Sequence, residues 1–123
     1  MYLDPEHAQF YFNRALTYSS KGEYKQAIKD YDKEISLHLE ASVIYTNRAF
    51  SYISLQENDK AIADLSKAIE LNPEDDKIYF FRSLIHFRQG YYMQAIEDFK
   101  KAVNLHPKYF TGTDFDEFNE YLT

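Results

Sequence analysis

The 123-residue chain contains no cysteine or tryptophan, and only three glycines and three prolines. The absence of cysteine excludes disulfides, thiolate zinc sites and cysteine nucleophiles. It is also compatible with a reducing compartment, so we expect a cytoplasmic protein. The scarcity of glycine and proline argues against a loop-rich β protein. No apolar run exceeds four residues, at 78–81. A membrane span needs about 18 such residues, so we expect no membrane insertion.

The chain also lacks an excess of basic charge. Its net charge is -6, and residues 8–109 hold all 14 basic residues together with 14 of the 20 acidic ones. The remaining acidic residues lie in the first seven and the last fourteen positions. No basic stripe is present that would follow a phosphate backbone, so we expect no nucleic-acid partner.

Motifs for catalysis or metal binding are missing as well. The four histidines show no metal-ligand spacing, and the sequence contains neither HExxH nor a glycine-rich phosphate loop. We therefore expect no catalytic residues, no metal and no cofactor, and we interpret the protein as a non-enzyme.

What the chain does have is an internal repeat. The segment Tyr11–Ala15 aligns with Tyr45–Ala49 and Tyr79–Ser83, each 34 residues further on. The same step relates Ala27 to Ala61 and then to Ala95. The sequence therefore predicts three units without insertions, at 8–41, 42–75 and 76–109.

The chain ends extend this frame. Leu3-Asp4-Pro5 is in register with Leu71-Asn72-Pro73, so we interpret residues 1–7 as the remnant of a preceding unit. Residues 110–123 do not continue the pattern. Phe115, Phe118 and Leu122 fall on one face of a predicted amphipathic helix, which we expect to cap the last unit against residues such as Phe99 and Val103. We expect one domain overall.

Each unit has the pattern of two helices. In the first unit, Tyr11, Ala15 and Tyr18 fall at helical spacing, and Gly22 suits a left-handed helix end. A second apolar stripe begins at Ala27 and runs to the end of the unit. The fold class expected from this pattern is all-α.

These units resemble the tetratricopeptide repeat family over about five-sixths of the chain. The 34-residue step, the aromatic-to-small spacing, the mid-unit glycine and the terminal proline carry the resemblance. It implies a right-handed superhelical solenoid of three antiparallel helix pairs, with the first helix of each pair lining a concave groove. It also implies a non-catalytic protein–protein interaction module that binds a peptide or helix of a partner protein.

The first two units depart from the family pattern. Gln56 replaces the mid-unit glycine, where a left-handed residue would cost about 1–2 kcal/mol, so that turn could take another shape. Glu34 stands where the later units have Ala68 and Ala102. We expect a looser or differently angled junction after the first unit.

The groove-facing positions that the resemblance implies are mostly apolar. This face is either covered by another segment or binds a partner, and Asn13 and Asn47 are placed to bond a peptide backbone. The candidate residues are Phe12, Asn13, Leu16, Thr46, Asn47, Phe50, Lys77, Phe80, Phe81, Leu84, Phe87 and Arg88.

Some chaperone-binding family members hold peptide carboxylates with a clamp of asparagines and basic residues. Asn47 and Lys77 match that clamp, but Phe12, Leu16 and Phe81 replace its other three members. A carboxylate would lose its hydration there with too little compensating charge. We therefore expect an apolar or mixed ligand.

A second periodic feature is a set of arginines. Arg14, Arg48 and Arg82 each precede an aspartate by 16 residues, namely Asp30, Asp64 and Asp98. The arginines are either a ligand-binding ladder or structural partners of the aspartates. The strict co-occurrence favours structural pairs, because a half-buried arginine needs a counter-charge.

Other functions remain open at this stage. The chain could be a structural segment or a self-associating scaffold of a longer array, joined through an open N-terminal face or through its C-terminal tail. A regulatory domain of a longer enzyme is a further alternative.

Overall fold

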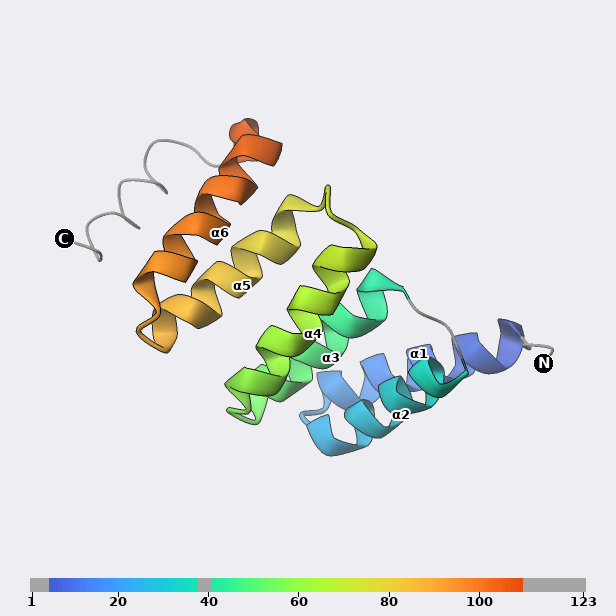
Figure 1. The fold of residues 1–123 in the computed structure, drawn as a ribbon. Coiled ribbons are helices and arrows are strands. Elements are labelled where there is room, and N and C mark those ends of the chain that lie inside the picture. Colours follow the sequence, from blue (N-terminus) through green and yellow to red (C-terminus); the bar gives the residue numbers. More distant parts are fainter. Residues whose placement is uncertain (1–4, 38–40, 110–123) are drawn as a thin grey trace. The chain divides into compact units, whose positions relative to one another are not determined.

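A computed structural model describes residues 5–37 and 41–109, with the side chains of 5–8 and 109 left aside. The chain divides into two compact units, residues 1–71 and 72–123, which are described separately. The described residues form six α-helices, one short 3-10 helix and no strand (Figure 1). The expected all-α repeat fold is confirmed, and the handedness of a superhelix stays a prediction. The capping helix expected in residues 110–123 lies outside the described residues.

The described residues of the first unit form four helices. They are α1 (Pro5–Ser20), α2 (Tyr24–Ser36), α3 (Ser42–Ser54) and α4 (Asn58–Leu71). Helix α1 packs against α2, α2 against α3, and α3 against α4. Helix α1 begins at Pro5, so part of the segment 1–7 already belongs to this helix. Proline is favoured at the first helical position because its fixed φ suits a helix and its missing N–H is not needed there.

Small side chains let the helices of the first unit approach closely. Ala15 of α1 and Ala27 of α2 are fully buried and share one core cluster with Tyr31 and Ile44. Ala49, Ala61 and Ala68 are fully buried in the second half of the unit. Alanine at these crossings brings the helix backbones together without leaving cavities.

The second unit contains α5 (Asp76–Arg88), α6 (Tyr92–Leu105) and the 3-10 helix η1 (Pro107–Tyr109). The side chain of Asp75 accepts a hydrogen bond from the Lys77 backbone N–H at 3.0 Å and caps α5. Ser83, Ala95 and Ala102 are fully buried, and the buried ring of Phe99 packs against Phe80 of α5.

The three mid-unit turns have one geometry. Gly22 and Gly90 have φ of 79° and 86°, and Gln56 has φ of 62°. In each turn two backbone hydrogen bonds close the helix end, for example Gln56 N to Ile53 O at 2.9 Å and Glu57 N to Tyr52 O at 2.9 Å. The expectation that Gln56 could change the shape of its turn is wrong, because both bonds form and hold the residue in the left-handed region.

None of the described helices is long and apolar enough to cross a bilayer.

Candidate functional site

The candidate surface of the first unit begins on α1. Leu16 exposes 38% of its surface, and its carbonyl accepts a hydrogen bond from Ser20 at 3.0 Å. Asn13 is exposed, and its side-chain oxygen accepts a hydrogen bond from Gln9 at 3.4 Å. Phe12 instead points into the unit, because its ring lies 6.5 Å from the ring of buried Tyr31. Phe12 is therefore a partly buried packing residue.

Helix α3 supplies the second part of this surface. Phe50 exposes 37% of its surface. Asn47 is half-buried. The hydroxyl of Thr46 donates to the Ser42 carbonyl at 2.8 Å, so its proton is engaged within the helix. The two helices meet where Ser19 and Ser51 place their hydroxyls 3.4 Å apart.

Helix α5 carries the candidate residues of the second unit. Lys77, Leu84 and Arg88 are exposed, and Phe81 is half-buried. Phe80 lies 6.1 Å from the ring of Phe99, so it packs inward against α6.

The same helix carries Phe87, whose ring lies 5.5 Å from that of Tyr92 in an edge-to-face contact. The aromatic face expected on α5 is thus partly a packing face.

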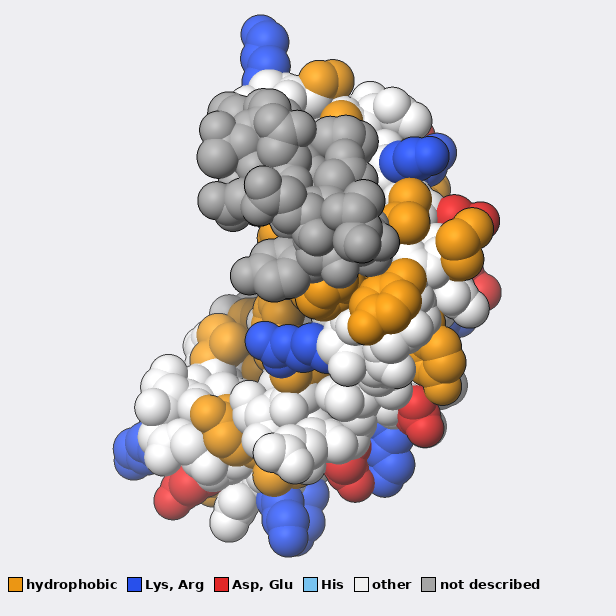
Figure 2. Space-filling model, turned by 90° about the vertical axis from the view of Figure 1, so that its left-hand side faces the viewer, with side chains coloured by type: hydrophobic (Ala, Val, Ile, Leu, Met, Phe, Trp, Pro, Cys, Tyr) orange, Lys and Arg blue, Asp and Glu red, His pale blue; other side chains and the backbone are white. Residues whose placement is uncertain are grey.

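Exposed apolar side chains are a general feature of this molecule. On the face drawn in Figure 2, hydrophobic side chains reach the surface between polar ones. Within the first unit, α1 and α3 bring Leu16 and Phe50 to the surface together with the amides of Asn13 and Asn47. Such a surface offers apolar contact area and a few directional hydrogen-bonding groups, which suits an extended or helical peptide.

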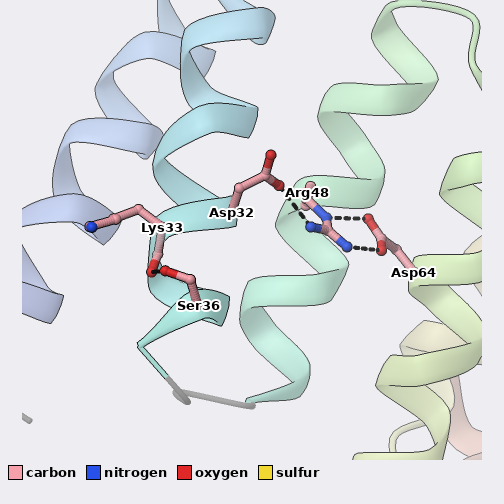
Figure 3. A network of polar contacts seen from close by, with 5 residues as sticks. All are labelled: Asp32, Lys33, Ser36, Arg48 and Asp64. Carbon is pink, nitrogen blue, oxygen red and sulfur yellow. Dashed lines mark hydrogen bonds and ion pairs between the residues drawn. The ribbon is translucent and has the colours of Figure 1, made fainter.

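The periodic arginines are paired with the periodic aspartates. Arg48 binds both oxygens of Asp64, with its Nε at 2.9 Å and its Nη2 at 2.7 Å (Figure 3). Arg14 binds Asp30 and Arg82 binds Asp98 in the same bidentate way. Asp30, Asp64 and Asp98 are buried. The structural interpretation of these residues is confirmed, since each pair joins the two helices of one repeat.

Sequence reasoning missed a contact between the first two repeats. The Nη1 of Arg48 donates to Asp32 of α2 at 2.8 Å, so this arginine joins two repeats (Figure 3). The two carboxylates that accept its hydrogen bonds raise the pKa of Arg48. The signal available in the sequence was the second 16-residue interval, from Asp32 to Arg48.

A second missed feature is the stacking of each arginine on aromatic rings. The guanidinium carbon of Arg48 lies 5.5 Å from the ring centre of Tyr45 and 5.7 Å from that of Tyr52. These tyrosines stand three residues before and four residues after the arginine, which is the spacing of one helix face.

In the part of the chain that the structure describes, no three histidine, aspartate or glutamate side chains gather closely enough to hold a metal ion.

Comparison with known proteins adds a family and several neighbours. Models of the tetratricopeptide repeat match residues 1–29, 42–75 and 76–109. No curated protein matches the chain. A similar solved structure is the first tetratricopeptide domain of Spaghetti (RPAP3) bound to the HSP90 peptide SRMEEVD. Its TM-score is 0.84 and its identity 25%, with coverage of 98% of this chain and 94% of that chain.

Two further neighbours share the fold. The second tetratricopeptide domain of human RPAP3, in complex with the HSP70 peptide SGPTIEEVD, has a TM-score of 0.83 and 23% identity, covering 96% of this chain and 97% of that one. The TPR2AB-domain complex of yeast Sti1 with pHSP90 has a TM-score of 0.81 and 26% identity, covering 97% of this chain and 46% of that one. Because family models match segments along most of the sequence and the described helices form the matching repeat fold, the chain belongs to the tetratricopeptide repeat family.

Proposed function

We propose that the protein is a non-catalytic interaction module that binds a peptide or helix of a partner protein. The ligand would lie on the exposed faces of α1 and α3, the first helices of the first two repeats. The observation that carries this proposal is the surface of the first unit, where Leu16 and Phe50 are exposed beside the amides of Asn13 and Asn47. Exposed apolar side chains gathered among polar ones are typical of binding surfaces. The amides would orient a peptide backbone, and the apolar side chains would supply contact area.

The solved neighbours support a peptide as the ligand. The first domain of RPAP3 is bound to an HSP90 peptide, and it is similar to this chain over almost the full length of both. That likeness supports peptide binding in general, whereas the side chains of this chain decide which peptide fits.

The side chains favour an apolar or mixed peptide. Within the first unit, Phe12 and Leu16 stand where carboxylate-clamping family members carry polar or basic residues. A C-terminal carboxylate placed beside these two side chains would lose water without gaining enough opposite charge. On the second unit, the exposed Lys77 and Arg88 of α5 would favour acidic residues in a ligand bound to that helix.

The proposal can be tested by selecting peptides from a random displayed library on the full chain. We expect the selected sequences to be rich in aromatic and aliphatic residues. Binding should be measured by isothermal titration calorimetry. Phe50→Asp places a charge in the apolar contact, so we expect it to weaken these peptides by about tenfold or more.

Two controls make this test specific. Met93→Asp alters an apolar side chain of α6 that is 71% exposed and lies outside this surface, so it should leave the selected peptides bound. The peptide SRMEEVD should bind more weakly than the selected ones. Selected peptides that bind Phe50→Asp and the unaltered chain equally would contradict the proposed surface. Tighter binding of SRMEEVD would contradict the apolar ligand.

A further inference from the structure

The contact between α2 and α3 shows how the first helix of one repeat packs against the last helix of the preceding repeat. Ile44 of α3 is only 5% exposed and belongs to one core with Ala27 and Tyr31 of α2. At the edge of this contact, Arg48 donates its Nη1 to the carboxylate of Asp32. The face of α3 that packs on α2 thus combines an apolar residue with an arginine that donates hydrogen bonds to a second carboxylate beyond its own Asp64.

Helix α1 carries the same face one repeat earlier. Phe10 and Arg14 stand 34 residues before Ile44 and Arg48. Phe10 is 55% exposed, and the side chain of Arg14 is 43% exposed compared with 19% for Arg48. We call Phe10, Tyr11 and Arg14 the α1 receiving face.

One N–H donor group of the Arg14 guanidinium makes no hydrogen bond to the described residues. Its Nε and Nη2 bind Asp30 at 2.8 Å and 2.7 Å, while its Nη1 donates to no described residue. The guanidinium is held over the rings of Phe10 at 5.2 Å and Tyr11 at 5.5 Å. A fixed cationic donor beside an exposed aromatic ring is complementary to a carboxylate on an apolar helix.

We propose that the α1 receiving face binds an amphipathic helix of a partner chain that presents a carboxylate to Nη1 of Arg14. The contact between Asp32 and Arg48 inside the molecule is its template, because that arginine accommodates two carboxylates at once. The stripe of Phe10 and Arg14 differs from that of Asn13 and Leu16, so this surface is separate from the proposed peptide site.

A second copy of this chain does not fit the same position. Two 34-residue steps after Asp32 stands the exposed Lys100 of α6. A copy stacked in register would therefore bring a lysine to Arg14, and juxtaposed like charges oppose association. The charge at this position selects an acidic helix of another protein.

The test uses the full chain and a peptide copy of α2, the helix that packs on α3 within the molecule. The probe is a fluorescent peptide of residues 24–37, held helical by a side-chain staple between positions 25 and 29. It carries Glu34→Ala, because alanine stands at this place in the other repeats. Fluorescence anisotropy should show saturable binding. The same peptide with Asp32→Lys should bind about tenfold more weakly, because a like charge then meets Arg14.

A matched pair of protein variants locates the binding. Phe10→Asp should abolish the difference between the two peptides, whereas Val43→Asp, at a residue that is 51% exposed on α3, should preserve it. Circular dichroism checks that both variants keep their helices. The comparison of the two peptides, which differ by Asp32→Lys, is made on the unaltered protein and so does not depend on the folding of a variant.

Three results would overturn the proposal. These are the absence of saturable binding, equal affinity for the two peptides, and the loss of discrimination in Val43→Asp but not in Phe10→Asp. Concentration-dependent growth of the unaltered chain in light scattering, removed by Phe10→Asp, would assign the face to a second copy instead.

Discussion

At the scale of the residue, the backbone conformation of Gln56 costs conformational free energy that a glycine at this position would not cost. Its φ of 62° is the left-handed region, where a side chain crowds its own backbone. Gly22 and Gly90 adopt the same conformation without that crowding, and a Cβ at either glycine would meet nothing within 4 Å. The cost at such a turn is therefore one of backbone conformation and not of space.

Gln56→Gly should raise the free energy of unfolding by about 1 kcal/mol, because glycine adopts a positive φ without crowding. Urea denaturation followed by far-UV circular dichroism measures the change. The matched control is Gly22→Ala, which should lower the free energy of unfolding by a similar amount. Destabilisation by Gln56→Gly would contradict the strain argument.

At the scale of the element, the arginines join helices with two kinds of ion pair. The pair of Arg48 and Asp64 is largely buried and bidentate, whereas Asp32 keeps 53% of its side chain exposed. A buried carboxylate left without its partner is costly, while an exposed ion pair contributes little. The contact within one repeat should therefore matter more for stability than the contact between repeats.

Arg48→Leu should lower the free energy of unfolding by about 3–5 kcal/mol, because it leaves buried Asp64 unpaired. Asp32→Ala should cost less than about 1 kcal/mol. Adding Asp64→Leu to Arg48→Leu should recover much of the loss, since no buried charge then remains. Equal effects of Asp32→Ala and Arg48→Leu in urea denaturation would show that this ranking is wrong.

At the scale of the whole molecule, one buried carboxyl group ties stability to pH. Glu34 is only 2% exposed, and its Oε1 has no hydrogen-bond partner among the residues that the structure describes. Burial, together with the nearby charge of Asp30, raises the pKa of Glu34 from 4.5 to about 7. The folded state therefore keeps a proton that the unfolded state has already released between these two values.

Stability should fall as the pH rises from about 4.5 to 7, by up to about 3 kcal/mol from this group. Below pH 4.5 both states are protonated, so its full contribution is present there. Glu34→Gln removes the titration and should flatten this part of the profile, measured by urea denaturation at a series of pH values. Glu97→Gln, at an exposed residue of α6, is the matched variant for the loss of one carboxylate. An unaltered slope in Glu34→Gln would contradict the assignment.

The sequence by itself determined the repeat frame, the helical class and the partners of the periodic arginines, because these follow from spacing along the chain. Local periodicity places Arg14 and Asp30, for example, on facing sides of one helix pair. The exposed Leu16 and Phe50 were also predictable as surface residues, since they follow the same frame.

Only the tertiary structure decided which of these side chains turn inward. Phe12 and Phe80 pack against Tyr31 and Phe99 of the neighbouring helices, so the candidate surface is less aromatic than its sequence predicts. The burial of Glu34 likewise depends on the helices around it. Spacing along one helix specifies a face, but the helices that pack on that face determine which of its atoms water can reach.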